Sequence, residues 1–267
     1  MNGERLQPLP LLPASALRPL RGVLTDIDDT LTRDGAIEPV ALRALHQLAR
    51  AQLPVIAITG RPAGWSEPFA MDWPVAAIVA ENGAVMLRRV GQWLQRDFTQ
   101  DAATRAANFL RLRQCAQAVR ERVPRAQLAR DSAGRLTDIA VDHSEFARLD
   151  AADIDAVLAV MRTHGLMASV SSIHINGWIG DHDKWSGARW AVERALDLPF
   201  DAAGWIYVGD STNDQRMFEH LPLSVAVANI RRFVPQLQVL PAYVTSSERG
   251  QGFAELVQRL LDAKQQA

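Results

Sequence analysis

The chain has little of several features that would narrow its class at once. It has one cysteine, Cys115, which excludes a disulfide within the chain and a zinc site built from several cysteines. It has 29 basic and 30 acidic residues, so no positive excess indicates a nucleic-acid partner. It has no apolar run long enough to cross a bilayer, which argues against a membrane partner. We therefore expect a cytoplasmic protein.

The N-terminus also lacks the pattern of a signal peptide. Prolines interrupt its apolar stretch, Leu9-Pro10-Leu11-Leu12-Pro13, and hardly any positive charge precedes it. Residues 1–19 are therefore expected to form a poorly ordered leader. Apolar residues make up 48 % of the 267, enough for a sizeable core in one large domain or two smaller ones.

The most informative stretch is Val23-Leu24-Thr25-Asp26-Ile27-Asp28-Asp29-Thr30, in which a short apolar run ends in three aspartates. Such a run predicts a buried parallel strand, and open α/β sheets place their sites at the carboxyl ends of such strands. Three adjacent carboxylates repel one another unless a cation compensates them, and Mg²⁺ prefers oxygen ligands of this kind. The alternative is an acidic turn that closes the strand.

Three further apolar runs, at 55–58, 76–80 and 205–208, also end in polar, turn-forming residues. Helical patterns alternate with these runs, which predicts βαβ units and a parallel, Rossmann-like sheet. Between them, residues 88–180 carry amphipathic helices and more polar, alternating strands. We predict an α/β core from residues 20–86 and 184–267, with an inserted α+β domain over 88–180.

Four short motifs follow one another along the chain: Asp26-x-Asp28-x-Thr30, Thr59-Gly60-Arg61, Lys184, and Gly209-Asp210-x-x-Asn213-Asp214. This ordered set resembles the haloacid dehalogenase superfamily of phosphohydrolases. The insert resembles the C2-type cap of its class IIB members, which include sugar-phosphate, sucrose-phosphate and mannosyl-phosphoglycerate phosphatases. The resemblance implies a Mg²⁺-dependent phosphatase that hydrolyses a small phosphomonoester, a sugar phosphate or phosphorylated sugar acid, through an aspartyl-phosphate.

The two aspartates at the first strand end suit the two halves of this reaction. Asp26 is the candidate nucleophile, a role known for carboxylates. Asp28, two residues on, points to the same side if the strand alternation persists, and is the candidate general acid and base. Thr59 supplies a hydroxyl and Gly60 a close backbone approach to the phosphoryl group.

The remaining core residues of the site are predicted to neutralise and orient charge. Lys184 brings a positive charge to the phosphate, and Asn213 orients Lys184 or a ligand, or caps a helix. Asp210 is predicted to bind Mg²⁺ with Asp26, and Asp214 is a less certain ligand. The resemblance adds the backbone carbonyl of Asp28 to this set.

Substrate preference is expected to reside in the insert. His174, Asn176 and Trp178 alternate along one strand face, which either contacts the substrate or packs inside the insert; Arg61 either contacts substrate or pairs with an acid. The insert is predicted to move as a lid on connections near Leu87–Val90 and Ile179–Lys184. The latter holds Asp181-His182-Asp183, interpreted as a solvated hinge loop rather than a second metal cluster.

Two other functions remain open. A phosphomutase is possible because some C2-capped relatives move phosphate between positions of one sugar. A non-catalytic phosphoryl-binding module is possible as well, although the intact Asp26, Asp28, Lys184 and Asp210 argue against it. Asp29 stands where many relatives have glycine and is interpreted as structural. The substrate and the oligomeric state are not determined by the sequence.

Overall fold

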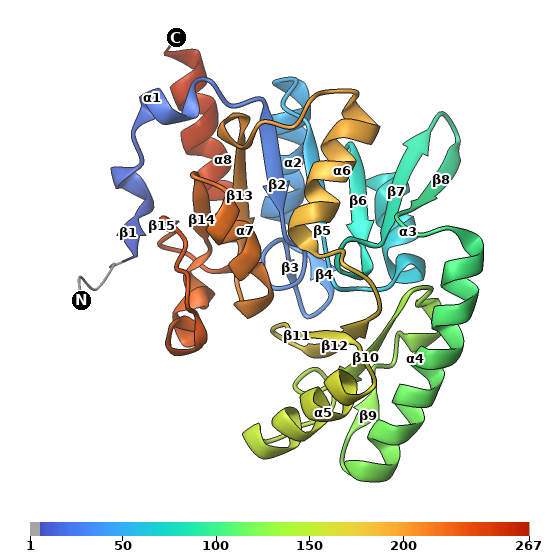
Figure 1. Cartoon of the computed structure of the whole chain (residues 1–267). Coiled ribbons are helices and arrows are strands. Elements are labelled where there is room, and N and C mark those ends of the chain that lie inside the picture. The colour runs from blue at the N-terminus through green and yellow to red at the C-terminus, as the bar shows by residue number, and fades with distance from the viewer. Residues whose placement is uncertain (1–5, 267) are drawn as a thin grey trace.

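The computed structural model describes residues 6–266 and shows an α/β core with a smaller domain at one edge of its sheet (Figure 1). The core sheet has the strand order β1-β15-β14-β13-β2-β5-β6-β7-β8. Its strands are β1 (Gln7–Pro8), β2 (Gly22–Thr25), β5 (Val55–Ile58), β6 (Ala77–Ala80), β7 (Val85–Val90), β8 (Trp93–Phe98), β13 (Trp205–Gly209), β14 (Ser224–Ala226) and β15 (Tyr243–Val244). In this order every neighbouring pair from β1 through β15 to β6 is parallel. The last two pairs, β6 with β7 and β7 with β8, are antiparallel.

Helices cover both faces of this sheet, which is why its central strands are apolar throughout. β2, β5, β6 and β13 have every residue buried. The helices of the core are α1 (Ala14–Leu17), α2 (Pro39–Arg50), α3 (Ala63–Asp72), α6 (Lys184–Leu196), α7 (Gln215–His220) and α8 (Arg249–Gln265). A short hairpin of β3 (Thr32–Arg33) and β4 (Ala36–Ile37) follows the first strand end.

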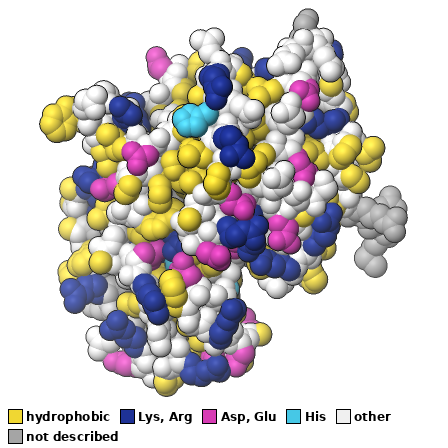
Figure 2. Space-filling view, turned by 180° about the vertical axis from the view of Figure 1, so that it is seen from behind, with side chains coloured by type: hydrophobic (Ala, Val, Ile, Leu, Met, Phe, Trp, Pro, Cys, Tyr) yellow, Lys and Arg dark blue, Asp and Glu magenta, His cyan; other side chains and the backbone are white. Residues whose placement is uncertain are grey.

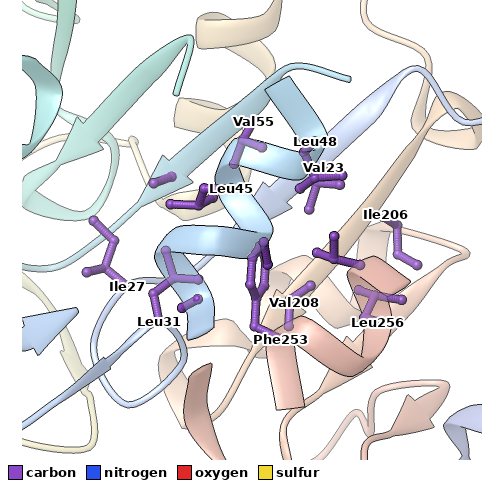
Figure 3. Packing of buried hydrophobic residues seen from close by; sticks show 14 of the residues in the cluster. Val23, Ile27, Leu31, Leu45, Leu48, Val55, Ile206, Val208, Phe253 and Leu256 are labelled. Atoms are coloured by element: carbon purple, nitrogen blue, oxygen red, sulfur yellow. The ribbon is translucent and has the colours of Figure 1, made fainter. Parts of the chain in front are cut away.

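Two apolar layers hold the helices to the sheet. On one face Leu45 and Leu48 of α2 and Phe253 and Leu256 of α8 pack against alternate residues of the central strands (Figure 3). On the other face the small residues of α6 and Met217 and Phe218 of α7 pack against the residues between those. Burial of these side chains fixes the register of the strands and thereby the position of the residues that follow them.

The inserted domain, called the cap here, has a core of its own. Its antiparallel sheet has the order β11-β12-β10-β9. The elements are α4 (Ala102–Arg122), β9 (Gln127–Leu128), β10 (Asp138–Asp142), α5 (Ala151–Thr163), β11 (Met167–Val170) and β12 (His174–Trp178). Leu112 and Val119 of α4 and Val157 and Met161 of α5 pack against this sheet. The predicted fold class, a Rossmann-like core with an inserted α+β cap, is confirmed.

The predicted lower boundary of the cap at residue 88 is wrong. Residues 85–98 form β7 and β8, which extend the core sheet, and the chain enters the cap only after Phe98. Arg88–Val90 and much of β8 are partly exposed because the hairpin forms the edge of the sheet. Their polar pattern therefore resembles that of the cap strands. The first connection between core and cap is accordingly residues 99–101.

The expectation of a poorly ordered leader is wrong for residues 6–19, while residues 1–5 lie outside the described part of the chain. β1 pairs with β15, and Leu9, Leu12 and Leu17 are buried against the core. The guanidinium of Arg259 on α8 also donates to the carbonyl of Pro10 at 2.8 Å. The prolines start short helical turns here instead of preventing order. Within residues 6–266 no helix combines the length and the apolarity that crossing a membrane requires.

Candidate active site

The three central strands deliver the predicted acidic and phosphate-binding residues to one edge of the sheet. β13, β2 and β5 are parallel neighbours, so their carboxyl ends lie side by side. Asp26 follows β2, Thr59 follows β5 and Asp210 follows β13, and all three side chains are buried. Residues far apart in the sequence thus meet where the cap covers the sheet edge (Figure 1).

Lys184 reaches this edge from the first position of α6 and is only 3 % exposed. Asp183 caps the helix by accepting the Ser186 N–H at 2.7 Å. Lys184 Nζ donates to Asp26 Oδ1 at 2.6 Å and to Asp214 Oδ1 at 2.7 Å. Burial alone would lower the pKa of Lys184, but the carboxylates of Asp214 and Asp26 raise it above its usual value. The ammonium therefore stays charged.

Asp214 is surrounded by hydrogen-bond donors. Its Oδ1 accepts from Lys184 and from the Tyr207 hydroxyl at 2.5 Å, and its Oδ2 accepts the N–H groups of Asp210 at 2.8 Å and Ser211 at 3.1 Å. Four donors occupy the lone pairs that a cation would need. The arrangement favours holding Lys184 over the metal-ligand role predicted for Asp214. Tyr207, inside a buried strand, carried no sequence signal for this contact.

The acidic cluster suits a divalent cation. One oxygen each of Asp26, Asp210 and Asp214 lie within 4.8 Å of one another. Asn229 Nδ2 donates to Asp210 Oδ2 at 2.9 Å, but within residues 6–266 no donor reaches the buried Oδ1. Burial raises the pKa of Asp210 well above its usual value, and burial raises the pKa of Asp26 to about 8 against the opposing charge of Lys184. Three buried carboxylates around the single ammonium of Lys184, with one Asp210 oxygen unpartnered, fit Mg²⁺.

Asp28 lies beside the loop that follows β5. Thr59 Oγ1 donates to Asp28 Oδ2 at 3.2 Å, and Arg61 Nε donates to Asp28 Oδ1 at 2.9 Å. The Arg61 N–H in turn donates to Thr59 Oγ1 at 2.9 Å. A Cβ at Gly60 would lie 3.2 Å from the Asn82 side chain of the core and 3.3 Å from the Asn176 side chain of the cap. Both contacts are tight, so glycine eases the fit of the loop between core and cap.

Two cap carboxylates that the sequence analysis did not single out complete the surroundings of Arg61. Arg61 NH1 donates to Asp131 Oδ2 at 3.1 Å and to Glu145 Oε2 at 3.2 Å, and NH2 donates to Glu145 Oε1 at 2.7 Å. Glu145 Oε2 also lies 3.0 Å from His174 Nε2. Neither carboxylate follows a core strand, so the order of motifs carried no signal for them.

The three predicted specificity residues of β12 separate into two groups. His174 and Asn176 line a pocket with Asp26, Asp28 and Asn213, and Asn176 Nδ2 donates to the Gly60 carbonyl at 3.0 Å. Trp178 lies elsewhere: its indole N–H donates to the His182 carbonyl at 2.8 Å. Four residues of extended strand span about 13 Å, which carries Trp178 past the pocket. The predicted contact of Trp178 with substrate does not agree with this position.

The loop before α6, which we expected to be a solvated hinge, is only partly solvated, because Asp181 is exposed whereas His182 is buried. His182 is only 8 % exposed, and burial lowers its pKa to about 4. Asp183 is used as the cap of α6. Among the described residues the metal-like cluster contains Asp26, Asp210 and Asp214 and none of residues 181–183. The arrangement therefore does not favour a second metal cluster in this loop.

Asp29 has a left-handed backbone conformation, which glycine adopts readily. Its φ is 54°, in the left-handed region where aspartate is tolerated better than most residues. Its carboxylate accepts from Arg249 Nε at 2.7 Å and from Arg232 NH2 at 3.3 Å. These contacts agree with the structural interpretation of Asp29 as an ion-paired residue.

The space around the site is divided in two. The pocket between Asp26, Asp28 and the cap residues His174 and Asn176 has a volume of about 10 Å³, room for about one water. A cleft of about 560 Å³ lies outside it, and Asp28 and Arg61 line both. A groove of about 750 Å³ between α1, α2 and α8 is larger but remote from the carboxylates. The cap is therefore closed over the strand ends.

Comparison with known proteins agrees with this architecture. A model of the haloacid dehalogenase-like hydrolase family matches residues 23–123. A phosphoglycolate phosphatase of Methanothrix thermoacetophila is 26 % identical over 90 % of this chain and 97 % of its own. A Thermoplasma acidophilum protein has a TM-score of 0.70 at 17 % identity, over 91 % of this chain and 98 % of that one. The sucrose-phosphatase of Synechocystis has a TM-score of 0.65 at 15 % identity, over 90 % and 98 %.

The fold and the ordered site residues define a capped hydrolase of the α/β class. The chain is similar to the haloacid dehalogenase-like hydrolases over residues 23–123 and to phosphatases over nearly its whole length, in agreement with the resemblance found in the sequence. The predicted enzyme class, a phosphoric monoester hydrolase, is confirmed at this level by the phosphatases among its full-length relatives.

Proposed function

We propose that this protein hydrolyses a small phosphomonoester with the help of Mg²⁺ and through an aspartyl-phosphate on Asp26. The observation that carries the proposal is the contact of Lys184 Nζ with Asp26 Oδ1 at 2.6 Å, beside the buried Asp210. A carboxylate at a strand end next to a fixed positive charge can attack a phosphorus atom while that charge neutralises the phosphoryl oxygens.

The chain's own residues supply binding and proton transfer. Thr59, Gly60 and Asn213 line the pocket or its loop and would hold the phosphoryl oxygens together with Lys184. Asp28, close to Asp26 and facing the cap, would protonate the leaving alcohol and then take a proton from the water that attacks the aspartyl-phosphate. Closure of the cap would keep other water away from the intermediate.

Mg²⁺ would be held by Asp26, Asp210 and, by resemblance, the carbonyl of Asp28. When bound, it supplies positive charge that offsets the phosphoryl oxygens and the buried carboxylates. We expect Mg²⁺ to raise the melting temperature of the wild-type protein, because a ligand bound only to the folded state stabilises it. Asp210→Asn should lose this increase, and an unchanged Mg²⁺ response in that variant would contradict the ligand set.

Asp26→Asn is the decisive test of the mechanism. Loss of the nucleophile should reduce turnover by on the order of 10³- to 10⁶-fold and prevent trapping of phosphate on the protein. Asp197→Asn is the matched control, because Asp197 has a left-handed φ of 52° that asparagine accepts and lies at the far end of α6. Substantial turnover by Asp26→Asn, with the control active, would reject the nucleophile.

The candidate substrates come from the relatives and from the family resemblance. Relatives at 25–27 % identity over nearly the whole chain are named phosphoglycolate phosphatases. Sugar phosphates and phosphorylated sugar acids remain candidates from the resemblance to class IIB. We propose a screen of 2-phosphoglycolate and sugar phosphates with and without Mg²⁺; phosphate release unaffected by thorough chelation would reject Mg²⁺ dependence. A cytoplasmic location stays a prediction.

A further inference from the structure

Arg61 has more negative charge around it than its own charge balances. It is 5 % exposed, and its guanidinium contacts three carboxylates: Asp28 of the core, and Asp131 and Glu145 of the cap. The proposed chemistry uses only Asp28 of these. The two cap carboxylates reach from another domain to this one cation, so the closed arrangement of the cap depends on a charge cluster next to the reacting groups.

The cluster stands between the enclosed pocket and the open cleft. Both spaces are lined by Asp28, Arg61, Ser172 and Ile173, whereas Glu145 lines the cleft but not the pocket. A substrate whose phosphoryl group reaches Asp26 would therefore place its leaving group against Arg61. The pocket of about 10 Å³ cannot hold a phosphoryl group, so the cap and this cluster have to shift when substrate binds.

The two cap carboxylates differ in how firmly they are fixed to Arg61. Asp131 is shared with Arg135, whose NH2 donates to Asp131 Oδ1 at 3.2 Å. Arg135 thus also holds Asp131 in place, although Arg135 pairs in addition with Asp138 at 2.8 Å. Glu145 instead meets Arg61 in a two-point pair, with both of its oxygens on NH1 and NH2. This fork is the geometry in which arginine binds the carboxylate of a ligand.

Glu145 lies on a loop whose conformation is fixed by hydrogen bonds to Asp142. The buried Asp142 carboxylate accepts the backbone N–H groups of Ser144, Glu145, Phe146 and Ala147 at 2.9 to 3.2 Å. His174 holds the Glu145 carboxylate from the other side. The loop is therefore preorganised, and as a part of the cap it would move with the cap on opening.

We propose that Arg61 binds the carboxylate of a phosphorylated carboxylic acid, and that Glu145 takes that position when the site is empty. The inference rests on the proposed phosphatase function and adds to it the chemical class of the leaving group. Opening of the cap withdraws Glu145 and leaves Arg61 free on one side. The acid group of the substrate then pairs with the same two nitrogens, while its phosphoryl group lies at Asp26.

The test compares two substrates that differ in the carboxylate alone: 2-phosphoglycolate and ethyl phosphate. Glu145→Gln keeps the size of the side chain but removes the competing charge, so it should raise the ratio of kcat/KM for the acid over ethyl phosphate by roughly three- to tenfold. Asp150→Asn removes a carboxylate from an exposed ion pair of the cap and should leave the ratio unchanged.

Arg61→Gln should act in the opposite direction and lower the same ratio by on the order of ten- to 100-fold. Because this change leaves Asp28 and Glu145 without their cation and Asp131 with Arg135 alone, the double variant Arg61→Gln/Glu145→Gln serves as the folded reference and should show the same low ratio. If Glu145 only positions Arg61, Glu145→Gln would lower the ratio as Arg61→Gln does, and that result would overturn the proposal.

A binding measurement separates this proposal from the proposed activity. Calorimetric titration of 2-phosphoglycolate and ethyl phosphate into Asp26→Asn, with and without Glu145→Gln, reports recognition without turnover. Tighter binding of the acid alone after Glu145→Gln supports the proposal even if no variant turns over. Wild-type turnover of ethyl phosphate with no preference for the acid would overturn the proposal and leave the phosphatase function intact.

Discussion

The cap contacts the core at two places, one formed mainly by backbone groups and the other by charged side chains. At the first, called the Glu81 contact, the buried Glu81 carboxylate accepts the backbone N–H groups of Leu136 at 3.0 Å and Thr137 at 2.6 Å and the Thr137 hydroxyl at 2.5 Å. Gly64 and Gly134 meet beside it, backbone against backbone. At the second, the Arg61 contact, long charged side chains meet next to a cleft.

The difference indicates which side of the cap is able to move. Backbone groups packed around one carboxylate fit a single geometry, whereas long charged side chains can pair in more than one arrangement. The segment that leads from the cap back to the core also passes close to the Glu81 contact. A side chain at Gly83 would collide with the backbone of Asp183 in this segment. Figure 2 shows acidic and basic side chains mixed where the core above meets the cap below. We expect the cap to rotate about the Glu81 contact and to open at the Arg61 contact.

The largest effect should come from Glu81→Ala. This change leaves buried N–H donors of the cap and of Ala63 without their acceptor, which should lower the free energy of unfolding by about 3 to 5 kcal/mol in urea titrations. Glu67→Ala is the control, since Glu67 forms a partly exposed ion pair with Arg96 and should cost less than about 1 kcal/mol. Equal losses in the two variants would remove the distinction between a fixed and a mobile contact.

Gly64→Ala should have the next largest effect. The added Cβ would lie 2.9 Å from the Gly134 Cα, so backbone on one side has to move. Alanine favours the helix by about 1 kcal/mol and overpacking costs about 1 to 3 kcal/mol, so we expect a net loss near 1 kcal/mol. Gly134→Ala is the matched change, with its nearest atom at 3.3 Å, and should cost less. A stabilised Gly64→Ala protein would mean that the contact is loose.

The sequence predicts the core of the molecule better than it predicts the contacts of the cap. The core strands and Asp26, Thr59 and Asp210 could be placed because buried parallel strands have a clear apolar pattern and their ends meet at one edge. Lys184 begins a helix and was singled out by the order of motifs alone. The edge hairpin of β7 and β8 could not, because partial exposure gives it the polar pattern of cap strands.

Cap contacts were harder to predict for a physical reason. The partners of Arg61 come from a loop and a short helical turn whose approach to the core depends on the rotation of a whole domain. Alternation along β12 correctly placed His174 and Asn176 on one face, but it says nothing of how far along the strand the pocket extends. Trp178 was included for that reason. Glu145 and Asp131 carried no pattern that distinguishes them from solvent-exposed acids.

The smallest of the three effects is a weakening of the Arg61 contact in acid. Burial would raise the pKa of Glu145, but hydrogen bonds from His174 and Arg61 outweigh it and hold the pKa at about 2. A carboxyl whose pKa is lowered by folding adds stability above its usual value near 4.5, and this stability is lost as the pH falls from there towards 2. Acid should therefore reduce the advantage of the wild-type protein over Glu145→Gln.

The expected difference is modest, below about 1 kcal/mol, because solvent reaches part of the Glu145 side chain and screens the pair. It is measured as the free energy of unfolding of both proteins at pH 6, 5, 4 and 3, with Asp197→Asn as the baseline for general acid effects. The gap between the wild-type protein and Glu145→Gln should narrow steadily below pH 4.5. A gap that stays constant or widens down to pH 3 would show that the Glu145 carboxylate does not hold the cap to Arg61.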